Sequence, residues 1–180
     1  MRKAVSIATI PFLPPIILFI HASSLDGKIV MSVPPIILAV VIPLIVIYLY
    51  TRRGGNREMR EELRARRMIM ITLGLAIMSL YELYDRLGLD TLARASLIYG
   101  LGTFLAGLFT ILGHKTSVHV MARSVSGFIE LTIRPVLGII MILVSVISGV
   151  SRIKTGAHTV SQVITGFLIG PLSVAILFIR

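Results

Sequence analysis

The chain contains no cysteine and no tryptophan, and only eight of its 180 residues are acidic. The absence of cysteine excludes disulfide bonds and thiolate metal sites. The polar segments 114–119 and 151–158, which hold the candidate histidines, contain no carboxylate, so the sequence does not favour a metal-dependent site. We therefore expect neither a metal ion nor an organic cofactor.

Apolar residues, by contrast, make up 56% of the chain, and the mean hydropathy is +0.94. Soluble domains average about 45–50% apolar residues even when glycine is counted. The sequence therefore predicts an integral membrane protein with no separate soluble domain. Its net charge of +10 is concentrated between apolar segments, which indicates contact with lipid headgroups and no nucleic-acid partner.

Seven apolar stretches are long enough, or nearly long enough, to cross a bilayer, which takes about 20 residues. They are residues 4–20, 31–50, 68–84, 93–113, 118–133, 135–150 and 159–179. The fifth and sixth are short and are separated by Arg134-Pro135, so a single kinked helix is an alternative to two spans. We expect one all-α domain, residues 1–180, a bundle of six to seven transmembrane helices, because backbone inside a bilayer must be hydrogen-bonded internally.

Most connections between these stretches are short, such as residues 21–29 and 85–90. The exception is residues 51–67, which hold seven arginines and, after Gly54-Gly55, suit a short surface helix. Two more polar clusters follow: HKTSVH at 114–119 and SRIKTGAH at 151–158. Two spans separate each cluster from the next, so all three are expected on one membrane face. A single span over 118–150 would instead place the last two clusters on opposite faces.

The last cluster continues into the pattern S-R-x5-H-x3-Q-V-x2-G, from Ser151 to Gly166. Here the chain resembles the type 2 phosphatidic acid phosphatase (PAP2) superfamily of integral membrane lipid phosphatases, whose third motif is S-R-x5-H-x3-D-V-x2-G. The matching residues are Ser151, Arg152, His158, Val163 and Gly166, and Gln162 stands where Asp is usual.

The two other motifs of that superfamily are matched less completely. Its P-S-G-H motif is matched by Ser117 and His119 at the same spacing, with Lys115 before them and without the Pro and the Gly. Its K-x6-R-P motif is matched only in spacing, by the pairs Arg57/Arg64 and Arg60/Arg67, with no Pro after either. The resemblance covers about residues 50–170 and implies a PAP2-like helical core there.

The resemblance implies a metal-independent phosphatase that hydrolyses a lipid phosphomonoester or diphosphate through a phosphohistidine on His158. His119 would protonate the leaving alkoxide and then activate water. A neutral imidazole is a good nucleophile near neutral pH, and a covalent intermediate divides the reaction into two easier steps. The structural alternative for His158 is a histidine that caps a helix start at the interface.

Gln162 lies four residues after His158, so the two side chains share a helix face. Its amide oxygen can accept a hydrogen bond from the imidazole and fix the tautomer, but it adds no negative charge. This predicts a working but less strongly activated nucleophile. A hydrogen bond between helices is the alternative role for Gln162.

Phosphate binding is assigned to arginine first, because the forked guanidinium donors match phosphate oxygens. Arg152 and one or two arginines of the 51–67 segment would hold the equatorial oxygens, while most of that segment contacts lipid headgroups. Ser117 with nearby backbone N–H groups would complete the cradle, Lys115 is a further candidate, and Ser151 is a supporting one. The candidates in the arginine-rich segment are Arg57, Arg60, Arg64 and Arg67.

A charged stripe follows from helical periodicity alone. His119, Arg123, Glu130 and Arg134 fall within roughly 60° of one another around a helix. Such a stripe in a membrane helix must face the bundle interior or water. Arg123, one turn below His119, would support it or touch substrate; the alternative is an interior ion network of Arg123 with Glu130.

Two other functions remain open at this point: a lipid phosphotransferase on the same scaffold, and a non-enzymatic carrier of lipid or ions with the charged stripe as its pathway. The expected partners are the bilayer and the lipid substrate, and the sequence neither requires nor excludes a homodimer. The balance of lysine and arginine places the site on the cytoplasmic face of the cell membrane. The sites of the PAP2 superfamily usually face away from the cytoplasm.

Overall fold

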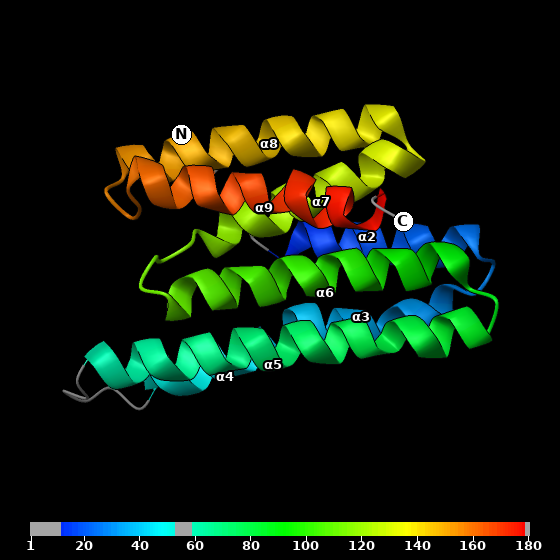
Figure 1. Ribbon diagram of the computed structural model, residues 1–180, viewed down its shortest axis with the longest axis horizontal. Helices are drawn as coiled ribbons and strands as arrows, with labels where there is room; N and C mark the ends of the chain where they lie inside the picture. The colour runs from blue at the N-terminus through cyan, green and yellow to red at the C-terminus, as the bar shows by residue number, and fades with distance from the viewer. Residues whose placement is uncertain (1–11, 53–58, 179–180) are drawn as a thin grey trace.

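The computed structural model describes residues 12–52 and 59–178, which form helices joined by short turns and contain no strand. Figure 1 shows the long helices lying side by side in one bundle. The elements in chain order are α2 (Leu13–Leu25), η1 (Ile29–Ser32), α3 (Val33–Ile36), η2 (Ile37–Val41), α4 (Ile42–Arg52), α5 (Met59–Arg86), α6 (Asp90–Ile111), α7 (Val118–Ile133), α8 (Pro135–Lys154) and α9 (Val160–Phe178).

Within the described residues, four helical stretches are long and apolar enough to cross a bilayer. They are Ile29–Val46, Met68–Arg86, Asp90–Ile111 and Pro135–Lys154. Helix α2 and the Val160–Ile176 part of α9 are apolar but shorter, and α7 carries the charged stripe. The prediction of a helical membrane protein is confirmed, whereas fewer helices reach the spanning length than the six to seven expected.

Helices α7 and α8 are separate, so the single kinked helix is excluded. The chain turns at Arg134, which has an extended backbone, and α8 begins at Pro135. The two helices then pack backbone to backbone, because a side chain added at Gly138 would collide with the main chain of Leu131. As a result the loops before α7 and after α8 lie at the same end of the bundle, on the left in Figure 1.

The prediction of a separate surface helix in the 51–67 segment was wrong. One helix, α5, runs without a break from Met59 to Arg86. Residues 59–73 contain neither glycine nor proline and are rich in arginine, glutamate, leucine and methionine, which favour helix. The helical signal therefore continues from the polar segment into the apolar one.

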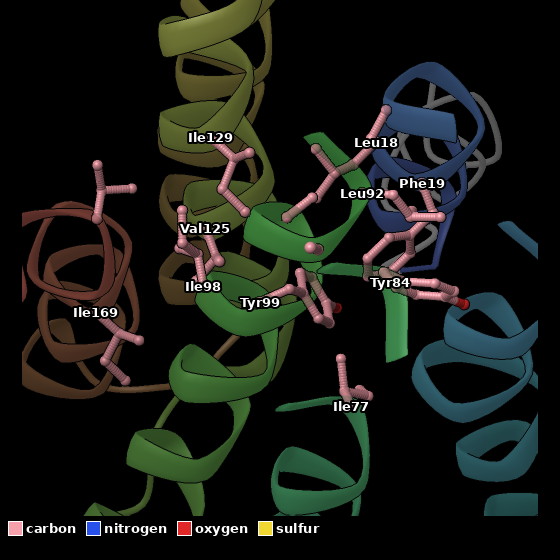
Figure 2. Close-up of a cluster of buried hydrophobic side chains, with 14 of the residues drawn as sticks. Leu18, Phe19, Ile77, Tyr84, Leu92, Ile98, Tyr99, Val125, Ile129 and Ile169 are labelled. Atoms are coloured by element: carbon pink, nitrogen blue, oxygen red, sulfur yellow. The ribbon is translucent and has the colours of Figure 1, made fainter. Parts of the chain in front are cut away.

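The apolar core joins α2, α5, α6, α7 and α9. Figure 2 shows Phe19 and Tyr99 in contact near Tyr84, with Ile77 close by. The Phe19 and Tyr99 rings meet edge to face, with centroids 5.4 Å apart. The side chains of Phe19, Tyr84 and Ile77 are fully buried.

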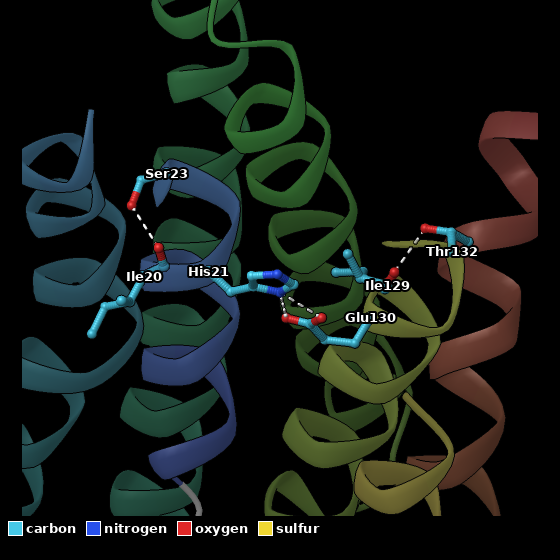
Figure 3. A network of polar contacts seen from close by, with 6 residues as sticks. All are labelled: Ile20, His21, Ser23, Ile129, Glu130 and Thr132. Carbon is cyan, nitrogen blue, oxygen red and sulfur yellow. Dashed lines mark hydrogen bonds and ion pairs between the residues drawn. The ribbon is translucent and has the colours of Figure 1, made fainter. Parts of the chain in front are cut away.

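Helix α2 ends at Leu25, five residues later than predicted, and the turn is confined to Asp26–Lys28. His21, expected in a connection, therefore lies inside the bundle. Its Nδ1 atom is 2.8 Å from Oε2 of Glu130 on α7, as Figure 3 shows. Residues 4–11 of the first apolar stretch lie outside the described part of the chain, and its residues 13–20 lie in α2.

Proline inside α9 is compensated by a neighbouring helix. Pro171 has no N–H group, so the carbonyl of Phe167 one turn earlier loses its partner in the helix. The hydroxyl of Ser124 on α7 donates to that carbonyl at 2.6 Å, as a buried carbonyl at membrane depth requires. The bond also fixes the position of α9 against α7.

Candidate active site

Two of the predicted polar clusters meet at one end of the bundle. The Ser117 N–H donates to the Gln162 carbonyl at 3.1 Å, and Nε2 of His114 lies 2.8 Å from Oγ1 of Thr165. His114, which the sequence left without a role, thus ties the loop before α7 to α9. The prediction that two helices between these clusters would bring them to the same end of the bundle is confirmed.

The third cluster begins at the same end, where α5 starts (Figure 1). Arg60, Arg64 and Arg67 lie on the first turns of α5, but their side chains lie outside what the structure describes. Arg57 lies outside the described residues altogether. Phosphate binding by these four arginines stays a prediction.

The spacing S-R-x5-H is a product of how α8 ends. The helix closes with Gly156 at φ +68°, a left-handed conformation that favours glycine. The N–H of Gly156 bonds the Ile153 carbonyl, and the N–H groups of Ala157 and His158 both bond the Arg152 carbonyl, at 3.0 and 3.3 Å. This Schellman-type turn folds the chain back so that His158 returns to the level of Arg152.

Helix α9 begins with a capping box, in which the cap residue and the third helical residue bond each other reciprocally. The hydroxyl of Thr159 accepts from the Gln162 N–H at 3.4 Å, and Oε1 of Gln162 accepts from the Thr159 N–H at 3.3 Å. Because a backbone N–H can only donate, the Gln162 atom facing it must be the amide oxygen.

The same Oε1 atom lies 3.0 Å from Nδ1 of His158, the contact that the i, i+4 spacing predicts. Since the amide oxygen only accepts, Nδ1 carries the proton and Nε2 keeps its lone pair. The amide oxygen of Gln162 is used locally, by Thr159 and His158. The role in nucleophile activation remains a prediction, but the geometry for it is present.

The surroundings of His158 disfavour its protonation. Burial lowers the pKa of His158 below its ordinary value, and the neighbouring Lys115 and Arg152 cations lower the pKa further, while the bond to Gln162 raises it. The imidazole is therefore neutral near pH 7, the form that a nucleophile needs.

A groove with a volume of about 420 Å³ opens beside these residues. Its polar end is lined by Lys115, Thr116, His119, Arg152 and His158, and its walls are almost entirely apolar. Nε of Arg152 is buried and has no hydrogen-bond partner in the described part of the protein. A buried donor without a partner is costly, so this end of the groove is prepared to receive acceptor oxygens.

Three other predicted residues do not line the groove. Ser117 is fully buried, its N–H donates to the Gln162 carbonyl, and its hydroxyl has no partner among the described residues, so its place in a phosphate cradle stays a prediction. Ser151 accepts a bond from the Thr155 N–H through its carbonyl, which helps to end α8. Arg123 is buried beneath His119, where Nη1 donates to the His119 carbonyl at 3.1 Å and to Oγ of Ser148 at 2.7 Å.

The charged stripe of α7 turns inward, as predicted, except at its end. Arg123 and Glu130 are buried and His119 is half-buried, whereas Arg134 is exposed at the turn to α8. The close polar contact of Glu130 is with His21, a residue that the stripe argument did not consider. Arg123 therefore supports the turn that carries His119, one of the roles that the sequence left open for it.

The last two matched residues of the motif pack the site together. A methyl group placed on Gly149 of α8 would lie 2.6 Å from Cγ1 of Val163, and one placed on Gly166 would lie 2.7 Å from the Ser117 carbonyl oxygen. Helix α9 therefore touches both α8 and the start of α7 at these positions. Their register is explained by packing as well as by the resemblance.

Two residues of the site were missed by the sequence argument. Thr159 was detectable, because T-x-x-Q before an apolar run is a capping-box signature. Thr116 had no such signal, and only the fold places it at the groove.

No known protein family, curated protein or solved structure matches the chain. The resemblance to the PAP2 superfamily therefore depends on the motif residues alone.

Proposed function

We propose that the chain is a membrane phosphatase of the PAP2 type that hydrolyses a lipid phosphomonoester or diphosphate through a phosphohistidine. The observation that carries the proposal is the pairing of a tautomer-locked imidazole with a guanidinium whose buried Nε atom has no partner among the described residues, at one end of an apolar groove. A histidine that only capped a helix would not require Arg152 beside it. In this chain the residue that caps α9 is Thr159.

In the first step Nε2 of His158 attacks phosphorus and the bond from phosphorus to the lipid oxygen breaks. His119 donates a proton to the departing oxygen, which leaves as a lipid alcohol or lipid phosphate. In the second step water attacks the phosphohistidine, His119 accepts a proton from the water, and the nitrogen–phosphorus bond breaks. The products are the dephosphorylated lipid, inorganic phosphate and the free imidazole.

Arg152 is the primary phosphate ligand in this scheme, because its guanidinium can donate two parallel bonds to the transferring group. Lys115 and Thr116 line the same end of the groove. No group of three histidine or acidic residues within the described ranges is placed to hold a metal ion. The negative charge on the phosphoryl and leaving oxygens would be stabilised by the cations, in a scheme that needs no metal.

The proposal includes a PAP2-like core in which α2, α7 and α9 also cross the membrane, beside the four longer spans. A phosphotransferase would share every residue, with an alcohol in place of water. The rival, a carrier of lipid or ions, would use the buried charges of α7 as a pathway and would not need a nucleophile.

The test is release of inorganic phosphate by the purified protein from a panel of lipid phosphates and diphosphates. We expect no release by His158→Ala, a reduction on the order of a hundredfold or more for His119→Ala, inhibition by vanadate and little effect of chelators. His114→Ala is the matched control, because that histidine bonds Thr165 and lies outside the groove. Full activity of His158→Ala would overturn the mechanism, and transport without phosphate release would favour the carrier.

A further inference from the structure

The apolar part of the groove extends far from the polar end. It follows α6 from Thr110 back to Tyr99 and follows α5 from Ile69 to Ile77. At 1.5 Å per residue the α6 segment is about 16 Å long, close to the thickness of one leaflet of hydrocarbon, about 15 Å. A chain that starts at the polar end and lies in the groove would therefore reach about the bilayer midplane.

The far end of the groove is closed. Ile77 is fully buried and Tyr99 is 4% exposed, and the Tyr99 ring is held by Phe19 behind it, as Figure 2 shows. The wall between α5 and α6 is also closed, because a methyl group placed on Gly74 would lie 2.6 Å from the Phe104 nitrogen. A bound chain cannot continue past Ile77 and Tyr99 without displacing the core.

The groove is also narrow. Its volume of about 420 Å³, divided by the length of about 16 Å along α6, gives a mean cross-section of about 26 Å². A hydrocarbon chain packed at van der Waals spacing of about 4 Å fills about 16–20 Å². The groove therefore has room for one extended chain along its length.

We infer that the site binds a lipid phosphate with one slender hydrocarbon chain in the groove, and that Ile77 and Tyr99 set the greatest chain length accepted. The inference rests on the proposed function for the headgroup end, and it adds a limit on chain length and the residues that set it. The third wall of the groove comes from η2 and the start of α4. Pro43 disturbs the helix there, and the wider π-helical turn of η2 places Leu38 and Ala39 at the groove.

The inference is tested by binding, so that turnover is not needed. Single-chain alkyl phosphates of increasing length are added to the protein in detergent micelles, each at the same mole fraction. The rise that each ligand causes in the Tm of the protein is measured. We expect the rise to grow with chain length and to fall at least fivefold once the chain exceeds the groove. Ile77→Ala should move this limit to longer chains by two or more carbons, and Ile77→Phe should move it to shorter ones.

Leu75 provides the matched control, because it is 51% exposed on the same helix. Leu75→Ala and Leu75→Phe should leave the limit unchanged. Thr103→Leu, at a half-buried groove position one turn from Tyr99, is a second shortening variant. Opposite shifts from the two Ile77 variants cannot arise from destabilisation alone, which would act in the same direction in both.

The outcomes separate the two proposals. Shifted limits without any phosphate release would retain the groove and overturn the phosphatase. Phosphate release with a limit that no Ile77 or Thr103 variant moves would retain the phosphatase and overturn the groove.

Discussion

His21 Nδ1 and Glu130 Oε2 lie 2.8 Å apart, although the two residues are 109 positions apart in the chain. The pair joins α2 to α7 (Figure 3), and the carboxylate is fully buried. Glu130 is eleven residues from His119 on α7, or about 16 Å along the helix. The pair therefore connects helices at a distance from the candidate site.

The His21–Glu130 pair predicts a loss of stability without a loss of catalysis. Glu130→Ala leaves His21 buried without its partner and should destabilise the protein by on the order of 3 kcal/mol. Replacing both residues with apolar ones, as in His21→Leu with Glu130→Leu, should recover most of that loss. Denaturant unfolding in detergent measures both effects. Single losses that simply add in the double variant would show that the two side chains are not coupled.

Gln162 predicts the pH dependence of phosphate release. The His158 imidazole must be neutral to attack, and burial lowers its pKa, so activity should fall on the acid side with a midpoint below the ordinary histidine value of about 6.5. Gln162→Glu keeps the acceptor and adds a negative charge that favours the imidazolium. The acid limb of kcat/KM should then move to higher pH.

A variant of Thr159 distinguishes the effect of Gln162 on His158 from its effect on helix capping. Gln162→Met removes both the bond to His158 and the capping box, whereas Thr159→Ala removes only the cap hydroxyl, at a cost of about 1 kcal/mol. We expect Gln162→Met to lower kcat much more than KM changes, and Thr159→Ala to lower stability with little effect on kcat. Equal effects of the two variants on kcat would assign Gln162 to capping alone.

Gly156 predicts a loss of activity from backbone geometry. Its φ of +68° is unfavourable for alanine by about 1–2 kcal/mol, and no atom lies within 4 Å of the added methyl group. Gly156→Ala should therefore move His158 relative to Arg152 and lower kcat by on the order of tenfold to a hundredfold. Gly88 has the same φ and the same open surroundings at the other end of the bundle. Gly88→Ala should cost similar stability in thermal unfolding and leave kcat intact.

The membrane orientation can be tested by labelling at two exposed leucines, one in a turn at each end of the bundle. Leu112 follows α6 at the site end, and Leu87 follows α5 at the opposite end; they are 72% and 43% exposed. The chain has no cysteine, so Leu112→Cys and Leu87→Cys each introduce a single thiol. With the site in the cytoplasm, an impermeant thiol reagent should label Leu87→Cys in intact cells and spare Leu112→Cys. The reverse pattern would place the site on the outer face.

The sequence by itself determined the features that depend on local chemistry. Apolar content required membrane helices, and the parity of the spans required the 114–119 and 151–158 clusters to meet. The four-residue spacing predicted the bond between His158 and Gln162, but not for the reason expected, because His158 lies before the start of α9 and does not share a helix face with Gln162. Inward burial of Arg123 and Glu130 followed from their shared helix face, since charge cannot face lipid.

Tertiary structure alone decided which partner each inward residue meets. His21 resembled the start of a connection because a histidine interrupts an apolar run, but Glu130 compensates its burial from another helix and α2 continues past it. Ser117, expected at the phosphate, is buried against α9, while Thr116 lines the groove. Periodicity shows which face of a helix is buried, but the neighbour that fills that face depends on contacts between distant segments, which local spacing does not encode.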